Sequence, residues 1–237
     1  MKQRGFAQGL FDVSSSKKEE LGTKRTGQNG KVSRYALSGA TALGAGVFVK
    51  GVAQAAAHEN QAILAAVPVG TYTLSVTVTV GTAIAANELA GGEFTINDGT
   101  GEGNSYEIDS NTAISASGTV VSLTLARPIK VALDTTSEFT LVRNPFYGGV
   151  VSATQTLPDI GVTPCAVAAN SYFWAQRAGL ACCLVDAGNV TGGQPFMPSD
   201  NTAGAIEDAD AVTERSPGIA LFATTAEEYA PVWLTME

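Results

Sequence analysis

Residues 71–80 alternate strictly between apolar and hydroxyl-bearing side chains. The apolar positions are Tyr72, Leu74, Val76, Val78 and Val80, and every position between them carries Thr or Ser. Because successive side chains of a strand point to opposite faces, this alternation predicts a strand with one buried face and one hydroxylated face. A chain containing such a segment is expected to build a sheet that covers a core on one side only.

Short apolar runs separated by Gly, Pro and Asn turns recur along the rest of the chain. We expect strands at residues 34–37, 47–49, 94–96, 106–108, 120–125, 139–142, 165–167, 172–176, 181–185, 218–223 and 230–235. Such spacing is typical of small barrels and sandwiches. The sequence therefore predicts an all-β fold, with an extended N-terminal arm followed by one or two small β-barrel or sandwich lobes. Residues 53–66, rich in Ala, Gln and Glu, are the single segment that favours a helix.

Charge is divided unevenly between the beginning of the chain and the rest. Residues 1–50 hold nine of the fourteen Lys and Arg but three of the twenty-two Asp and Glu, whereas residues 51–237 are strongly acidic. A basic segment rich in Gly and Ser and poor in apolar residues is expected not to fold alone. We therefore predict an extended basic arm over 1–50, a β-rich domain over 51–148 and a small barrel-like domain over 149–237.

The arm is expected to bind an acidic protein surface. The cations that would carry this contact are Lys17, Lys18, Lys24, Arg25, Lys31 and Arg34. Phosphates of a nucleic acid are the alternative ligand, but the arm lacks interleaved aromatic residues and is joined to an acidic body. Charged residues make up 15% of the chain, against about 25% in average soluble domains, so we expect another protein to cover part of its surface.

Candidate catalytic and metal sites are few. His58 is the single histidine and has no nucleophile motif beside it, which favours a surface histidine over a catalytic one. The loop 97–103 offers oxygen ligands suited to calcium, yet a glycine-rich hairpin turn explains the same residues. The acidic stretch 198–217 contains four carboxylates, Glu207, Asp208, Asp210 and Glu214, from which a glycosidase could draw its two catalytic carboxyl groups. A solvated loop is favoured. We expect no catalytic residue, metal or cofactor.

The three cysteines, Cys165, Cys182 and Cys183, do not have the spacing of a disulfide framework or a zinc site. On a strand, one of the adjacent pair is expected to be buried and the other partly exposed. Tyr172, Phe173 and Trp174 form an aromatic group that suits sugar stacking, a subunit interface or core packing. Sequence alone does not separate these three roles.

No apolar run reaches the roughly 18 residues of a membrane helix, and no signal-peptide pattern is present, so we expect synthesis in a cytosol.

Several segments together resemble virion structural proteins of tailed bacteriophages, especially marine ones. They are residues 22–24, 34–46, 89–103, 133–137 and 172–174. The closing segments 216–223 and 229–235 are similar to the last strands of capsid decoration, or cement, proteins. That resemblance implies a small β-barrel on the capsid exterior, although residues 60–148 have no counterpart in the minimal members.

These observations lead to the expectation of a capsid decoration protein made in the host cytoplasm. It would bind the outer surface of the major capsid protein lattice, bridge neighbouring subunits and associate with itself as a trimer or dimer. Neither nucleic acid nor membrane is expected as a partner. The alternative is a tail, fibre or baseplate adhesin that recognises host glycans, and a virion-borne hydrolase is the least supported hypothesis.

Overall fold

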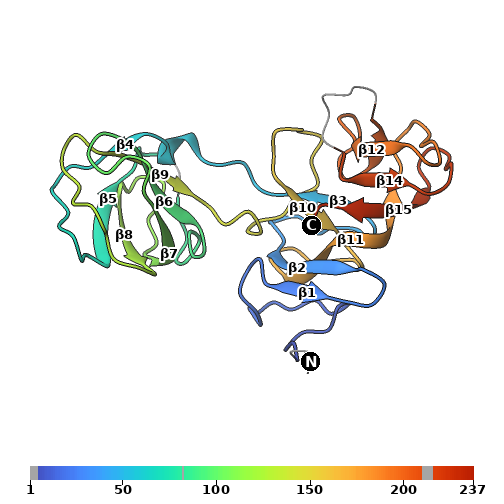
Figure 1. The fold of residues 1–237 in the computed structure, drawn as a ribbon, viewed down its shortest axis with the longest axis horizontal. Coiled ribbons are helices and arrows are strands. Elements are labelled where there is room, and N and C mark those ends of the chain that lie inside the picture. The colour runs from blue at the N-terminus through green and yellow to red at the C-terminus, as the bar shows by residue number, and fades with distance from the viewer. Residues whose placement is uncertain (1–4, 82, 210–215) are drawn as a thin grey trace. The chain divides into compact units, whose positions relative to one another are not determined.

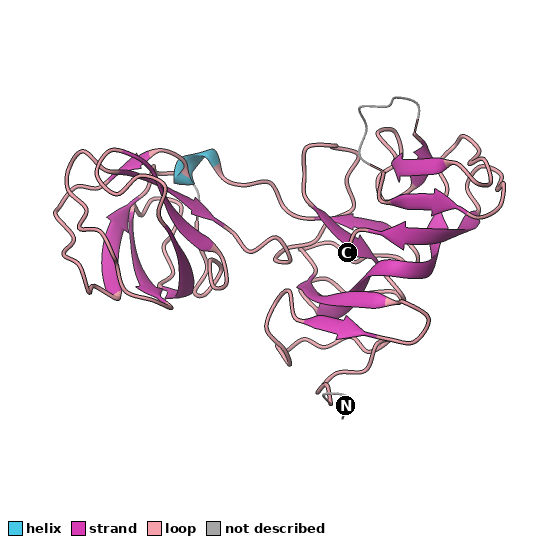
Figure 2. Ribbon diagram, viewed as in Figure 1, coloured by secondary structure: helices cyan, strands magenta, loops and turns pink. Residues whose placement is uncertain are grey.

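The computed structural model describes residues 5–81, 83–209 and 216–237. It divides the chain into two compact units, of which unit 1 comprises Met1–Val52 with Pro145–Glu237 and unit 2 comprises Ala53–Asn144 (Figure 1). Unit 2 is therefore inserted into the chain of unit 1. Strands dominate both units (Figure 2), which confirms the all-β prediction. Within the described ranges, no helix has the length and apolar character needed to cross a membrane.

Unit 1 is built around one long strand, β11 (Tyr172–Leu184), which pairs with β2 on one side and β15 on the other. Its main sheet runs in the order β1-β2-β11-β15-β14-β12-β13, and β10 pairs with both β11 and β3. The other strands are β1 (Lys24–Thr26), β2 (Val32–Leu37), β3 (Phe48–Lys50), β10 (Asp159–Val162), β12 (Pro195–Pro198), β13 (Ile206–Asp208), β14 (Gly218–Ala220) and β15 (Tyr229–Thr235).

The predicted strands 172–176 and 181–185 are two halves of this single strand. The register shifts between Gln176 and Ala178 where β11 pairs with β2, so the strand bends without ending. Gly179, with φ of 81°, lies in the bend, and a Cβ there would come within 3.1 Å of the Lys31 backbone. Glycine is favoured here because its φ lies in the left-handed region and a Cβ would make a tight contact with the neighbouring backbone.

The N-terminal residues are an integral part of unit 1, which corrects the prediction of an extended arm over 1–50. Strands β1, β2 and β3 all come from that range, and β2 pairs with β11 over six positions. Ahead of them, Phe6 packs edge-on against Trp174 with ring centroids 5.0 Å apart. The Trp174 indole N–H also donates to the Gln8 carbonyl oxygen. Contacts made by a few apolar and aromatic side chains thus hold the polar N-terminal segment against β11.

Unit 2 is a six-stranded antiparallel sheet in the order β4-β9-β6-β7-β8-β5. Its strands are β4 (Gln61–Ala62), β5 (Thr73–Thr77), β6 (Glu93–Asp98), β7 (Ser105–Asn111), β8 (Val120–Leu125) and β9 (Glu138–Val142). In β5, Leu74 and Val76 are buried and Thr73 and Ser75 are exposed, as the alternation predicts. At the ends of the predicted strand, however, Tyr72 and Val80 are exposed.

The predicted helix over 53–66 is wrong. That range contains a three-residue 3₁₀ turn, η1 (Ala56–His58), followed by the short strand β4. Helix propensity alone does not hold a helix in place when no apolar stripe is available for packing. Here the buried side chains are His58 and Ile63, which are not spaced as one helical face.

Candidate functional site

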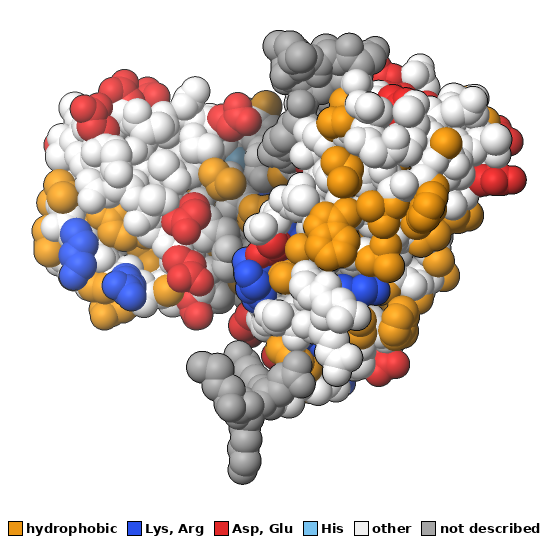
Figure 3. Space-filling view, turned by 45° about the vertical axis from the view of Figure 1, so that its right-hand side comes forward, with side chains coloured by type: hydrophobic (Ala, Val, Ile, Leu, Met, Phe, Trp, Pro, Cys, Tyr) orange, Lys and Arg blue, Asp and Glu red, His pale blue; other side chains and the backbone are white. Residues whose placement is uncertain are grey.

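The outer surface of β11, β15 and β14 in unit 1 is unusually apolar. Leu180, Trp233 and Ile219 lie directly opposite one another across the three strands, and each is at least 40% exposed. A second row places Pro231 beside Leu221, whose N–H donates to the Pro231 carbonyl, and Tyr229 continues the same face of β15. We call these six residues the apolar face; apolar side chains gather over much of the surface of unit 1 turned to the viewer in Figure 3.

The opposite side of these strands is also apolar. Val232 and Leu234 of β15 and Ala220 of β14 point inward and belong to a buried cluster with Phe48 and Phe196. An antiparallel sheet with one solvated side normally alternates between apolar and polar residues. Strands that are apolar on both sides are typical of a sheet covered on both sides, and exposed apolar patches of this kind mark interaction sites.

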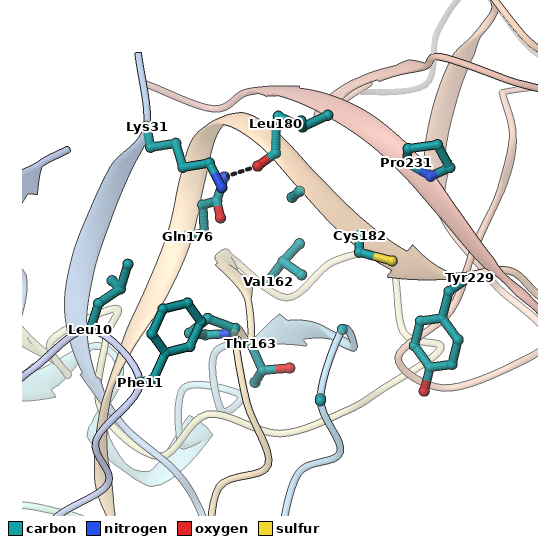
Figure 4. Close-up of a pocket in the computed structure, with 14 residues that line it drawn as sticks. Leu10, Phe11, Lys31, Val162, Thr163, Gln176, Leu180, Cys182, Tyr229 and Pro231 are labelled. Atoms are coloured by element: carbon teal, nitrogen blue, oxygen red, sulfur yellow. Dashed lines mark hydrogen bonds between the residues drawn. The ribbon is translucent and has the colours of Figure 1, made fainter. Parts of the chain in front are cut away.

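A pocket of about 490 Å³ adjoins the apolar face. Figure 4 shows Leu10, Phe11 and Lys31 on one side of it and Cys182, Tyr229 and Pro231 on the other. Tyr229, Pro231 and Leu180 belong to both the pocket wall and the apolar face. The two features therefore form one continuous surface.

Polar atoms inside the pocket are largely occupied by structural hydrogen bonds. The Thr163 hydroxyl donates to the Gly44 carbonyl, and the Gln176 side-chain amide donates to the Leu180 carbonyl. Partial desolvation raises the pKa of the Cys182 thiol, although the residue is exposed, and this disfavours the reactive thiolate. The pocket thus presents mainly apolar walls, and its polar lining groups include the Lys31 ammonium and the Tyr229 hydroxyl. Such an arrangement can bind a ligand but supplies no nucleophile with an adjacent base.

Two of the predicted arm cations are engaged in a partly exposed ion cluster on Glu237. Its carboxylate lies 2.7 Å from the Arg34 guanidinium, 3.1 Å from that of Arg177 and 3.2 Å from the Lys24 ammonium. Hydrogen bonding from Arg34, aided by Lys24, lowers the pKa of Glu237 from 4.5 to about 2. The cluster ties β1, β2 and β11 to Glu237, two residues after the end of β15, so these cations stabilise unit 1 itself.

The other arm cations differ in their surroundings. The Arg25 guanidinium lies over the rings of Phe6 and Trp174, 5.1 and 5.5 Å from their centroids, and donates to the Gln8 carbonyl. Lys17 forms an exposed ion pair with Glu20. Within the described residues, Lys18 and Lys31 have no acidic side-chain partner. A role for the six cations in binding another protein stays a prediction, and Lys18 and Lys31 are the two best placed for it.

The aromatic group on β11 belongs mainly to the core. Phe173 and Trp174 are fully buried, and Tyr172 is half-buried and stacks on Tyr35 with ring centroids 5.7 Å apart. Of the three roles left open by the sequence, core packing is therefore the one that Phe173 and Trp174 fill. Neither ring is available to stack on a sugar or to anchor a subunit from outside.

His58 is fully buried, so the prediction of a surface histidine is wrong. Both of its ring nitrogens lack a hydrogen-bond partner among the described residues. Burial lowers the pKa of His58, the positive charge of Arg143 lowers it further, and Glu88 opposes both effects. Arg143 and Glu88 are paired with each other at 2.7 Å.

The predicted loop 97–103 is a hairpin turn between β6 and β7. Asp98 accepts the Gly99 N–H, and Thr100 donates to Asp134, so these oxygens are committed to the turn. Across the part of the chain that the structure describes, no group of three His, Cys, Asp or Glu side chains is placed to hold a metal. A cation at this loop therefore has no support from the geometry.

The acidic stretch 198–217 is not a uniform exposed loop. Glu207 and Asp208 lie on β13, where Asp208 accepts hydrogen bonds from the backbone and hydroxyl of Thr191. Burial and the neighbouring Asp186 raise the pKa of Glu207. Asp210 and Glu214 lie outside the described residues. Both described carboxylates have structural partners, and no aromatic sugar platform lines their pocket.

The adjacent cysteines behave as predicted, since Cys183 is buried and Cys182 is exposed, and all three thiols are free. Sequence reasoning missed the apolar face, although a signal was present. In 229–235, the apolar residues do not alternate with polar ones but occupy both sets of positions.

Comparison of the chain with models of protein families, with curated proteins and with solved structures found no match.

Proposed function

We propose that this chain is a capsid decoration, or cement, protein of a tailed bacteriophage. In this function it is a non-enzymatic structural protein that binds the outer surface of the major capsid protein lattice and bridges neighbouring subunits. The observation that carries the proposal is the apolar face of unit 1. The resemblance of several sequence segments to phage virion proteins adds support that is independent of the structure.

The apolar face supplies the affinity in this proposal. Trp233, Leu180 and Ile219 are each partly exposed, and covering apolar surface gains about 25 cal/mol per Å². A permanent contact needs roughly 1,000 Å² or more of buried surface, so the surrounding residues of unit 1 must contribute as well. Because Lys24, Arg34 and Arg25 are engaged within unit 1, we assign the predicted electrostatic attraction to a secondary role.

An adhesin that recognises glycans was the alternative from sequence. That hypothesis places glycan recognition at Tyr172, Trp174 or the loops, and Trp174 is fully buried. No other observation in the described residues favours it. The decoration function is therefore the one that the geometry supports best.

The test is binding to phage heads that lack this protein. A double variant, Trp233→Ser with Ile219→Ser, removes the centre of the apolar face while leaving the inward residues of β14 and β15 intact. We expect the variant to bind heads at least about tenfold more weakly in co-sedimentation. Leu64→Ser in unit 2, where Leu64 is 68% exposed, is the matched control and should bind normally.

Two outcomes would contradict the proposal. One is wild-type affinity of the double variant for heads, with folding verified by tryptophan fluorescence. The other is a location confined to the tail in electron micrographs of particles that carry a labelled copy. Copy number gives a third check, because a head protein is expected in hundreds per particle and a tail protein in far fewer.

A further inference from the structure

Phe11 is the most exposed aromatic residue at the pocket beside the apolar face. It lines the pocket, yet its side chain is 67% exposed, so most of the ring projects beyond the rim. Figure 4 shows it on the N-terminal side of the pocket, across from Tyr229 and Cys182. One small area of unit 1 thus carries both a projecting apolar ring and an apolar hollow large enough to receive one.

The same area carries one charge of each sign that has no ionic partner among the described residues. Lys31 lines the pocket and has no acidic partner within the described residues. Asp12 follows Phe11, and the structure gives its carboxylate the Gly9 N–H as a hydrogen-bond donor but no cation among the residues it describes. The projecting ring is therefore accompanied by a negative charge, and the hollow by a positive one.

We infer that a second copy of this chain occupies the pocket, in a two-fold symmetric dimer. Phe11 of each copy enters the pocket of the other, and each Asp12 approaches Lys31 of the partner subunit. In a two-fold contact, a residue i of one copy meets j of the other, and j meets i in return. A ring and a receiving hollow that lie side by side satisfy this condition, whereas a head-to-tail ring of copies needs them on separate surfaces.

The contact extends beyond the pocket. Tyr229 and Leu180 are half-exposed at its edge and would be covered by the partner, while Trp233 and Ile219 lie farther along the sheet. This inference is independent of the proposed function, since a dimer formed through the pocket leaves the centre of the apolar face available. Capsid binding and dimerisation are therefore separable by variants.

Sedimentation velocity of the full chain between about 1 and 200 µM is the test. The wild type is expected to show a reversible monomer–dimer equilibrium, and Phe11→Ser should weaken the dimer at least tenfold. Because Phe11 is exposed, its removal leaves the core intact. Leu64→Ser, an equally exposed apolar position in unit 2, is the matched control and should leave the equilibrium unchanged.

A charge exchange tests the pairing itself. Lys31→Glu and Asp12→Lys should each weaken the dimer several-fold, and the two substitutions combined should restore it toward the wild-type constant. A strictly monomeric wild type, a trimer, or a dimer unaffected by Phe11→Ser would each overturn the inference. A monomeric wild type whose binding to heads is lost in Phe11→Ser would assign the pocket to the capsid protein and would equally refute the dimer.

Discussion

At the scale of single residues, the Glu237 carboxylate forms ion pairs with basic residues that are distant in the sequence. Its pKa of about 2 lies below the ordinary value of 4.5, so the folded chain holds the ionised form more tightly than the unfolded chain does. The stabilising contribution is complete above pH 4.5 and is lost as the pH falls toward 2. Acid should therefore weaken unit 1 within this interval.

Because solvent screens this partly exposed cluster, we expect Glu237→Gln to lower the free energy of unfolding of unit 1 by about 1–2 kcal/mol at pH 7, less than the full pKa shift implies. Both tryptophans, Trp174 and Trp233, lie in unit 1, so denaturant unfolding followed by tryptophan fluorescence reports on this unit. The difference between variant and wild type should shrink between pH 4.5 and 2. Glu20→Gln, which breaks the exposed pair with Lys17, should change stability by less than about 0.5 kcal/mol.

Unlike Glu237, which is held by ion pairs, His58 is buried with no hydrogen-bond partner for either ring nitrogen among the described residues. Its pKa is lowered in the folded state, so the unfolded chain takes up a proton first when the pH falls below 6.5. Stability of unit 2 should consequently decrease from pH 7 to pH 5. Arg143 and Glu88, the charged groups that act on His58, are paired with each other, and the attraction of Glu88 for the imidazolium is outweighed by burial and by Arg143.

His58→Phe should remove this acid sensitivity and raise the free energy of unfolding of unit 2 by about 1 kcal/mol at pH 7, since an unsatisfied polar group is lost. His58→Gln keeps buried polar atoms but does not titrate, so it should abolish the pH dependence without the gain at pH 7. Calorimetry resolves the transition of unit 2 that tryptophan fluorescence does not follow. An unchanged pH dependence in both variants would show that His58 is not the responsible group.

At the scale of elements, the hairpin loop between β6 and β7 requires glycine for two different reasons. Gly99 has φ of 74°, and a Cβ there would lie 1.9 Å from the Thr136 carbonyl oxygen. Gly103 has φ of 80°, but a Cβ there would meet nothing within 4 Å. Both positions disfavour a side chain conformationally, and only Gly99 also excludes it sterically.

Gly103→Ala should therefore cost about 1 kcal/mol, whereas Gly99→Ala should cost about 4 kcal/mol or more. Thermal unfolding of unit 2 measures both. Equal costs for the two substitutions would mean that the close approach of Thr136 relaxes freely, and the steric argument would then fail.

The elements that sequence predicts best are those whose pattern is local. The alternation in 71–80 and the apolar runs at 120–125 and 139–142 predict strands because side-chain direction alone decides which face is buried, and the structure has strands at Thr73–Thr77, Val120–Leu125 and Glu138–Val142. Residues 53–66 were mispredicted because composition favours a helix, whereas packing around His58 and Ile63 does not. The continuity of β11 was missed because Gly179 marks a bend that only the approach of Lys31 explains.

The candidate site was harder to predict because it depends on contacts between distant segments. The basic residues Lys24 and Arg34 were expected to be free, and nothing near them in sequence shows that Glu237 neutralises them. Likewise, the pocket joins Phe11, Lys31 and Tyr229, which only the sheet order brings together. The apolar face was locally encoded in 229–235, yet its exposure could be known only from which strands flank β15.

At the scale of the whole molecule, each unit has its own core. One cluster, which includes Phe94, Phe139 and Ile108, lies entirely within unit 2, and the clusters around Phe48 and Phe173 lie entirely within unit 1. A segment with a self-contained core and sheet can fold independently of the chain into which it is inserted. The full chain should thus unfold in two transitions.

The two places where the chain leaves and re-enters unit 1, at Val52 and Pro145, are close together. A Cβ on Gly51 would lie 3.0 Å from the Pro145 carbonyl oxygen, and one on Gly148 would lie 3.4 Å from the Val52 side chain. A linker of about three residues spans up to roughly 10 Å, which is enough to join Val52 to Pro145 directly. Residues 53–144 can therefore be removed without pulling the strands of unit 1 apart.

We expect residues 53–144 alone to unfold cooperatively, and unit 1 closed by a Gly-Ser-Gly linker to keep the tryptophan fluorescence and stability of the full chain within about 1 kcal/mol. Both pieces are measured by calorimetry, with the full chain as reference. If the closed unit 1 also retains binding to phage heads, the apolar face acts without unit 2. Aggregation of either isolated piece, or a single transition in the full chain, would show that the units depend on each other for folding, because a self-contained core does not need its neighbour to exclude water.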